Sequence, residues 1–416
     1  MTLATRAAVP PSLRIARRWA HQNLFSSPAN TLLMLGISLL IGFSLYGILR
    51  FVFISAEWEV VTTNRRQFFV GRFPEAELFR AWIMVYLLAG MSGLSLGLWS
   101  KAGLRSAVVL AGALIPVFLF IGGGSVAVLT AGSVGLFALT HVVARTLLAP
   151  APRLDLIRTL TIVAWLIAFS VAMFILGSVP RLLWGGLMLT LILALVGIVA
   201  SFPLGMLLAV GRASTFPVIR VFSVVYIEVI RGVPLITLLF MAQFILPLMI
   251  EPERNLSLLG WEVSILGRSI PLTGYEMDDV VRALAAITLF SAAYLAEIIR
   301  GGLQAVPRGQ VEAAQALGMS TPRILAFIVL PQAVRAVIPA IVGQFISLFK
   351  DTSLVAVAGL GVTDLLRVTR TVTAQQDFIG RQAEVLLFAS LIYWVIAFSM
   401  SRASQQLERT LGVGER

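Results

Sequence analysis

Long apolar runs separated by short polar segments make up most of the chain. Most of the runs reach about 20 residues, which is the length of helix that crosses the hydrocarbon core of a bilayer. They predict about ten membrane-spanning helices, near residues 31–54, 80–99, 106–124, 125–147, 156–178, 183–210, 221–250, 284–301, 334–360 and 384–401. Between the third and fourth runs, a tight turn near residues 122–125 and one long broken helix are both open. The pattern therefore predicts an all-α, polytopic membrane protein.

The polar segments divide the chain into four parts. These are a basic tail (1–30), an N-terminal half of about five spans (31–180), a second half (183–407) and a short tail (408–416). Residues 55–79 read as a mixed-charge loop and residues 251–279 as a long polar loop, both on the outer side. The first apolar run is too long for a signal-peptide core, so we expect it to be retained. Arginine and lysine are commoner on the side that holds both termini, which predicts that both termini are cytoplasmic.

The composition supports a membrane protein and excludes several kinds of site. Hydrophobic residues make up 58% of the chain, charged residues 12%, and the mean hydropathy is +0.94. The net charge of +12 is nearly all arginine, and the arginines sit mostly at the ends of apolar runs, so we expect a membrane environment and no nucleic acid. With no cysteine, disulfides and thiol chemistry are excluded, and His21 and His141 are too few and too far apart for a histidine metal site.

The two lysines of the chain, Lys101 and Lys350, bear on nucleotide binding. Neither follows a glycine, so the chain has no P-loop of the G-K-[ST] type. If the protein uses ATP, another chain must bind it.

The polar segment 307–331 has a pattern of its own. Pro307 can start a helix, and Gly318 can end it as a C′ glycine. Thr321 as N-cap and Pro322 as N1 predict a second helix, which Pro331 should disrupt near Leu330. In the first helix, two alanines would let a partner approach closely, and a glutamate near the helix start suits the macrodipole and can reach a partner's cation.

The spacing in this segment is Glu312-Ala313-Ala314, three residues, Gly318, nine residues, and Ile328-x-Leu330-Pro331. It resembles the EAA motif of ABC-transporter permease subunits, EAA-x3-G-x9-I-x-LP, at every fixed position. In that family the segment is a cytoplasmic loop whose coupling helix docks into a groove on the ATPase subunit. An ordinary amphipathic loop helix is the alternative reading. The resemblance implies ATPase-coupling roles for Arg308, Glu312, Ala313, Ala314, Leu317 and Gly318.

The second half carries further short motifs. They are residues 201–205 (SFPLG), 226–228 (YIE), 231–234 (RGVP), 293–297 (AYLAE), 300–302 (RGG) and 350–354 (KDTSL). Together they resemble the permease subunits of polar amino-acid ABC importers, the histidine/glutamine branch. The resemblance implies the type I importer, or MetI-like, five-helix core in the C-terminal half. The added N-terminal half resembles the long permease subunit of general L-amino-acid transporters.

The same resemblance implies the partners. They are a pair of ATPase subunits that hold ATP and Mg, a second permease subunit that is a homologue rather than a copy of this chain, and a periplasmic amino-acid-binding protein. It places the chain in the bacterial inner membrane as a transport subunit that has no cofactor and is not an enzyme. Short members lack the N-terminal half, for which we expect lipid-facing packing or partner choice.

Charged and polar residues inside apolar runs are candidates for the substrate path. Lys350 and Asp351 fall within the run 334–360, where charges are costly and should face a partner or a wet cavity. An amino acid carries a carboxylate and an ammonium, which such a pair could meet, with Ser353 adding a hydroxyl. Gln243 and Tyr294 are weaker candidates. A structural hinge, or an ion pair with another span that tunes gating, is the alternative.

Two acid–arginine pairs stand three residues apart. Glu228 with Arg231, and Glu297 with Arg300, are spaced for local ion pairs on a helix. We expect them to be structural, with a role in gating as the alternative.

Two other function classes compete with an ATP-driven importer. An ion-coupled secondary transporter of amino acids or other small polar solutes would favour internal repeats and more buried carboxylates than this sequence has, and no convincing repeat between the two halves is evident. An intramembrane enzyme is disfavoured, since the chain has no HExxH and no cysteine.

Overall fold

A computed structural model of the chain describes residues 24–99, 128–249 and 278–411, together with residues 22, 126, 262–265 and 268–271. Within this part, eight helices are long and apolar enough to cross a membrane, and a bent pair makes a ninth candidate. The eight are Pro28–Ser55, Glu75–Trp99, Val128–Leu148, Leu154–Leu176, Gly186–Arg212, Asp279–Ala305, Thr321–Val357 and Gln382–Gln405. The expected polytopic all-α class is confirmed. The run 106–124, and the turn expected at 122–125, lie outside the described residues.

The chain divides into two units, Met1–Trp58 and Glu59–Arg416. In the first, helix α2 (Pro28–Arg50) begins at Ser27, whose hydroxyl accepts a hydrogen bond from the Asn30 amide. A π-helical turn, η1 (Phe51–Ser55), continues it. None of the residues of α2 is buried, as suits an apolar helix surrounded by lipid.

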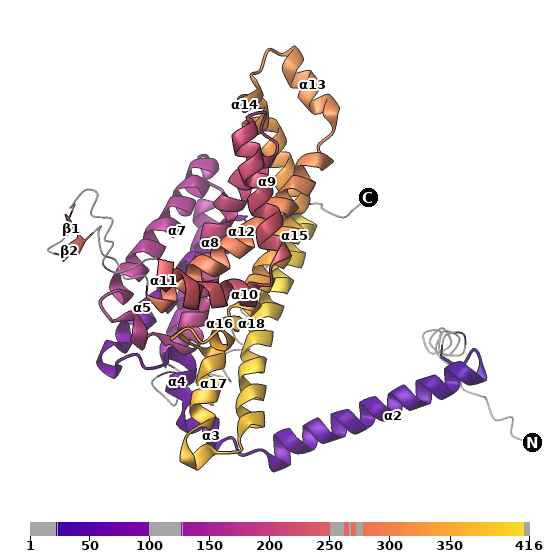
Figure 1. Cartoon of the computed structure of the whole chain (residues 1–416), viewed down its shortest axis with the longest axis vertical. Helices are drawn as coiled ribbons and strands as arrows, with labels where there is room; N and C mark the ends of the chain where they lie inside the picture. The colour runs from indigo at the N-terminus through magenta and orange to yellow at the C-terminus, as the bar shows by residue number, and fades with distance from the viewer. Residues whose placement is uncertain are drawn as a thin grey trace, which may run out of the picture. The chain divides into compact units, whose positions relative to one another are not determined.

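The second unit is built around α12 (Asp279–Ala305), which packs between α8 (Gly186–Arg212) and α15 (Leu330–Asp351). Figure 1 shows these helices side by side, with α18 (Gln382–Leu411) along α15. Small residues let the helices approach: a Cβ on Gly302 would lie 2.5 Å from the Ala333 carbonyl oxygen. With the bent span described below, these helices form the expected five-helix core.

The remaining described elements complete the second unit. They are α3 (Glu59–Thr63), α4 (Arg65–Val70), η2 (Glu75–Glu77), α5 (Leu78–Trp99), η3 (Ala144–Leu148), α7 (Leu154–Leu176), η4 (Arg181–Leu183), α9 (Pro217–Gly232), α10 (Leu235–Phe240), η5 (Met241–Ile245), α11 (Leu246–Met249), β1 (Glu262–Ile265), β2 (Arg268–Pro271), α13 (Arg308–Ala316), α14 (Thr321–Ile324), η6 (Leu325–Val329), α16 (Leu354–Val357), β3 (Thr363–Asp364), α17 (Leu365–Thr373) and η7 (Gln376–Phe378). β1 and β2 pair antiparallel within the segment expected to be a polar loop.

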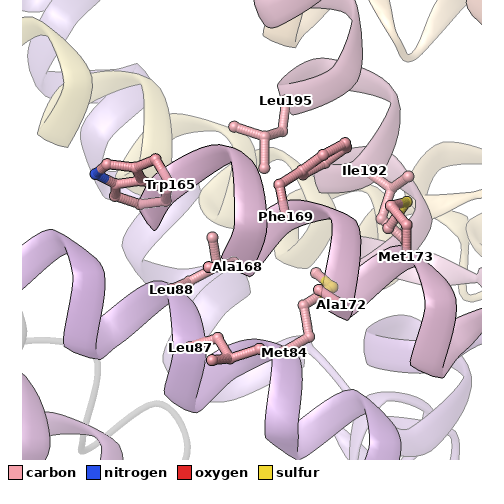
Figure 2. Close-up of a pocket in the computed structure, with 10 residues that line it drawn as sticks. All are labelled: Met84, Leu87, Leu88, Trp165, Ala168, Phe169, Ala172, Met173, Ile192 and Leu195. Atoms are coloured by element: carbon pink, nitrogen blue, oxygen red, sulfur yellow. The ribbon is translucent and has the colours of Figure 1, made fainter. Parts of the chain in front are cut away.

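Helices of the N-terminal half pack directly on the core. Figure 2 shows side chains of α5 and α7 meeting those of α8, with Phe169 and Leu195 facing each other across the seam. The cavity between them has a volume of about 20 Å³ and an apolar lining, so it offers no polar partner to a water molecule. This packing on the core adds to the lipid-facing packing or partner choice that we expected for this half.

The run 221–250 is not one straight span. α9 and the helix that follows it meet at an angle of 101°. The break falls at Val233 and Pro234, where the proline disfavours helical conformation in the residue before it. A broken span or a re-entrant segment replaces the continuous helix that hydropathy suggested.

The helix after Gly318 also departs from expectation. Its N-cap is Ser320, not Thr321. The disruption expected near Leu330 is present as the π-helical turn η6, which ends at Val329, and the helix then continues into α15. α15 ends at Asp351, and the expected single span, about 334–360, lies mostly within the longer candidate span Thr321–Val357. A turn and the short α16 follow.

Residues 55–79 are largely helical rather than an exposed loop. α3, α4 and η2 occupy most of the segment. Val60, Val61, Phe68 and Phe73 are each at most 1% exposed. These apolar side chains pack against the core, which outweighs the charge of their neighbours. Within the second unit, α3, α4 and α17 lie at one end of the helix bundle and α13 lies at the other (Figure 1).

Candidate functional site

The clearest candidate site is α13, at the end of the bundle that we call the α13 end. Pro307 is its N-cap and Leu317 its C-cap. Gly318 follows with φ of +75°, the left-handed conformation of a C′ glycine, as the sequence predicted. Glu312, Ala313 and Arg308 are exposed, and Leu317 is 83% exposed.

Ala314 differs from the expectation that both alanines face a partner. It is 2% exposed. α13 packs on α14 and η6, so this alanine lies within the chain's own loop. A methyl group at this position allows α13 to rest closely on the following helix. Of the expected coupling residues, those that remain exposed are Arg308, Glu312, Ala313, Leu317 and Gly318.

An ion network lies between α8, α9 and α12, on the α13 side of the bundle. Glu297 is its centre, 2.5 Å from an Arg300 nitrogen, 3.7 Å from Arg231 and 3.5 Å from Arg212. Arg212 also binds Glu228 at 2.9 Å. One carboxylate therefore holds arginines from three helices together, which ties the helix ends to one another.

The three-residue spacing along one helix predicted one of the two local ion pairs correctly. Glu297 and Arg300 do pair on α12. Glu228 instead pairs with Arg212 of α8, so the expected Glu228–Arg231 pair is wrong. A helix–helix contact, which spacing along one helix does not report, provides the better partner. Tyr294 belongs to this region, because the Arg231 guanidinium lies 5.5 Å from the centre of its ring.

Lys350, Asp351 and Ser353 lie at the end of α15 rather than in the middle of a straight span. Lys350 is exposed and Asp351 is half-buried. The Ser353 hydroxyl donates to the Lys350 carbonyl oxygen at 2.7 Å, closing the last turn. A lysine at a helix C-terminus suits the macrodipole. The end of the helix at Asp351 therefore accounts for part of this motif.

The other candidates of the path do not join this group. The main-chain oxygen of Gln243 accepts a hydrogen bond from Arg282 at 3.2 Å. Among the described residues, the buried Oε1 of Gln243 has no hydrogen-bond partner. Arg282 also pairs with Asp279, whose second oxygen accepts from the Gly361 amide at 2.9 Å. No sequence pattern had indicated Arg282 and Asp279 as site residues.

Asp364 is a buried carboxyl at the opposite end of the bundle, the α17 end. It is 0% exposed and accepts hydrogen bonds from the amides of Leu366 and Arg367, so it caps α17. Burial raises the pKa of Asp364 from 3.8 to about 7, against the lowering effect of those amides. The sequence analysis also missed this residue, although an aspartate directly before an amphipathic run is an N-cap signal.

Comparison with known proteins gives the family. Residues 201–413 match the family described as "Binding-protein-dependent transport system inner membrane component". The inner membrane amino-acid ABC transporter permease protein YhdY of Escherichia coli K12 is 34% identical over 411 residues, 95% of this chain and 93% of that protein.

Two further relatives match about half of the chain. The glutamate/glutamine/aspartate/asparagine transport system permease protein BztC of Rhodobacter capsulatus is 42% identical over 55% of this chain and 48% of its own length. The glutamate/aspartate import permease protein GltK of Escherichia coli O6:H1 is 37% identical over 56% of this chain and 95% of its own length. The chain therefore belongs to the binding-protein-dependent transport system inner membrane components, as a multi-pass permease subunit of the ABC transporter class.

Proposed function

We propose that this chain is the permease subunit of an ATP-driven importer of L-amino acids, polar or broad in range. The observation that carries the proposal is the EAA segment, folded into an exposed helix between two spans. The names of the relatives supply the substrate class, since those three proteins are named for amino acids.

The proposal assigns the α13 end to the cytoplasm of a bacterium, in the inner membrane, with both termini on the same side. A pair of separate ATPase subunits, which bind ATP and Mg, docks on α13. A periplasmic binding protein delivers the amino acid at the α17 end. The second permease subunit is a homologue, and this chain itself is a transport component without a cofactor or an enzymatic activity.

Contacts between α13 and the core suggest how movement of the ATPase reaches the membrane. α13 packs on α14 and η6, which continue without interruption into α15. Glu312 and Arg308 are available to charged groups of the ATPase, and Leu317 to an apolar pocket on it. A displacement of α13 would therefore move α15 as a lever. Alternating access requires such a moving element.

Two groups of residues are proposed, one for the substrate path and one for gating. Lys350, Asp351 and Ser353 stand at the far end of that lever, where the helix breaks. Among the residues that the structure describes, Gln243 Oε1 in the bent span has no hydrogen-bond partner. Tyr294 is a further candidate of the path. The network of Glu228, Arg231, Glu297 and Arg300 is proposed to gate the cytoplasmic side, since it ties three helix ends together.

Co-purification tests this assembly. The chain is tagged, extracted in mild detergent, and its partners are identified by mass spectrometry. ATP hydrolysis by the complex is then measured with and without loaded binding protein. We expect an ATPase subunit, a second permease, and stimulation by the loaded binding protein. A chain that purifies alone, without ATPase activity, would contradict the proposal.

A further inference from the structure

A segment of the N-terminal half is built into the α17 end of the core. We call residues 59–73, which include α3 and α4, the outer strap. The Phe68 ring is fully buried and meets Phe388 of α18 edge to face, with ring centres 5.1 Å apart. Figure 1 shows α3 and α4 beside α17 at this end of the second unit.

Backbone contacts join the strap to two other segments. Gly71 of the strap forms an antiparallel bridge with Trp184. The two residues that follow Trp184 form parallel bridges, Gly185 with Thr363 and Gly186 with Asp364. Three stretches that are far apart in sequence thus meet main chain to main chain, at the start of α8 and of α17.

The main chains at this junction lie so close together that they require glycine. Gly71 has φ of +65°, and a Cβ there would lie 2.4 Å from the Gly185 Cα. Gly186 has φ of +59°, and its Cβ would lie 2.5 Å from the Phe68 carbonyl oxygen. Any other residue would force the segments apart. The junction is therefore a specific contact and not a loose overlay.

Side chains fasten the strap to the connection between α15 and α18. The Gln375 amide donates to Asn64 Oδ1 at 3.1 Å, and Asn64 is 5% exposed. The segment that the strap covers is itself buried: Leu360, Leu365, Val368 and Val372 are each at most 1% exposed. This partly buried amide pair joins two specific residues of the strap and the connection.

We propose that the outer strap holds the α15–α18 connection on α8, so that the outer end of α15 is a fixed pivot during transport. The inference rests on the proposed function, because a pivot matters only if α13 moves the other end of α15. Asn64, Phe68 and Gly71 are then positioning residues. The strap gives the N-terminal half a role in transport beyond lipid-facing packing.

The absence of cysteine from the chain allows a direct cross-linking test. In the full complex, Asn64→Cys and Gln375→Cys are combined and oxidised, with each single variant as control. A fixed pivot predicts cross-linking without nucleotide, with ATP and with loaded binding protein, and uptake within about twofold of the reduced protein. Loss of uptake by about tenfold or more on oxidation, restored by reductant, would show that the strap must detach and would overturn the proposal.

A second variant weakens the strap instead of locking it. Phe68→Ala should speed hydrogen exchange of the α17 amides by about tenfold or more and leave those of α12 unchanged. Uptake should fall by a similar factor while ATPase and permease partners still co-purify. Phe68→Leu, which keeps most of the buried volume, should restore both readouts.

The two readouts separate failure of this inference from failure of the proposed function. Unchanged α17 exchange in Phe68→Ala would overturn the strap whatever the chain transports. Faster exchange with normal uptake would keep the contact but refute the pivot. Faster α17 exchange in a chain that shows no ATP-driven uptake, even as wild type, would support the contact and refute the transport proposal on which the pivot depends.

Discussion

The two ends of the second unit are built in opposite ways. At the α13 end, a nine-residue helix exposes Glu312 and Leu317 and rests on the chain through Ala314. At the α17 end, Phe68, Leu365 and Val372 are fully buried between segments from both halves of the chain. A surface intended for a partner must stay uncovered and carry its own recognition residues. An end that must stay in place is fixed by packing within the chain.

The largest effect is expected at the exposed end. Glu312→Lys reverses a charge on α13 that no residue of the chain neutralises in the described structure. Uptake by the complex should fall by about 100-fold or more, because a docked like charge costs several kcal/mol. Uptake of labelled amino acid into cells or vesicles measures this, with insertion checked by the amount of chain in the membrane.

Gln310→Lys provides the matched control for that change. It adds a lysine to the same exposed helix about 200° away around its axis. Normal uptake is expected. Equal damage from both substitutions would mean that α13 tolerates no added positive charge, and the docking role of Glu312 would lose its support.

Two glycine substitutions contrast the ends directly. Gly186→Ala should destabilise the protein by about 3 kcal/mol or more, because its φ of +59° and the nearby Phe68 oxygen both exclude a Cβ. Gly309→Ala, with nothing within 4 Å of its Cβ, should be neutral or stabilise by up to about 1 kcal/mol. Thermal unfolding of both purified variants in detergent measures the difference. Equal unfolding temperatures would contradict the described junction.

The ion network is expected to give a smaller effect. Glu297→Gln leaves three arginines without their shared carboxylate, whose side chain is 23% exposed, and should cost about 2 kcal/mol after allowance for that exposure. Glu228→Gln removes a carboxylate that is 57% exposed and should cost less than about 1 kcal/mol. Unfolding temperatures rank the two, and the reverse order would reject Glu297 as the centre of the network.

The last prediction concerns the pH dependence of stability that Asp364 causes at the α17 end. Its folded-state pKa of about 7 lies above the ordinary 3.8, so the folded state retains the proton longer. The stability it contributes is fully present below about pH 4 and is lost as the pH rises through about 7. From about pH 6 to pH 8 the wild type should lose about 1 kcal/mol. Asp364→Asn should lack this component when unfolding is followed across that range, and an identical pH profile would contradict the assignment.

Features that depend on a single segment of the chain were predicted well from the sequence. Most expected spans are present, and α13, Gly318 and the Glu297–Arg300 pair lie as their local patterns indicated. Each depends on hydropathy, a cap or a fixed spacing along one helix. These signals are complete within about 20 residues of chain.

The features that the sequence did not predict depend on contacts between segments that are far apart in the chain. The outer strap alternates charges with Val60, Val61 and Phe68, and its charges suggested a loop until the core supplied a surface for the apolar residues. α17 has apolar residues at 365, 368 and 372, a helical spacing that the search for long runs passed over. Pro234 carried a readable signal for the bend, but hydropathy alone continued through it.

The most direct test of the account is uptake into proteoliposomes that contain the purified complex, loaded binding protein and labelled amino acid. We expect uptake that requires ATP together with the ATPase subunit, that Glu312→Lys abolishes, and that does not respond to proton or sodium gradients. Uptake by this chain alone, driven by an ion gradient without ATP, would contradict the ATPase-driven permease and indicate a secondary transporter.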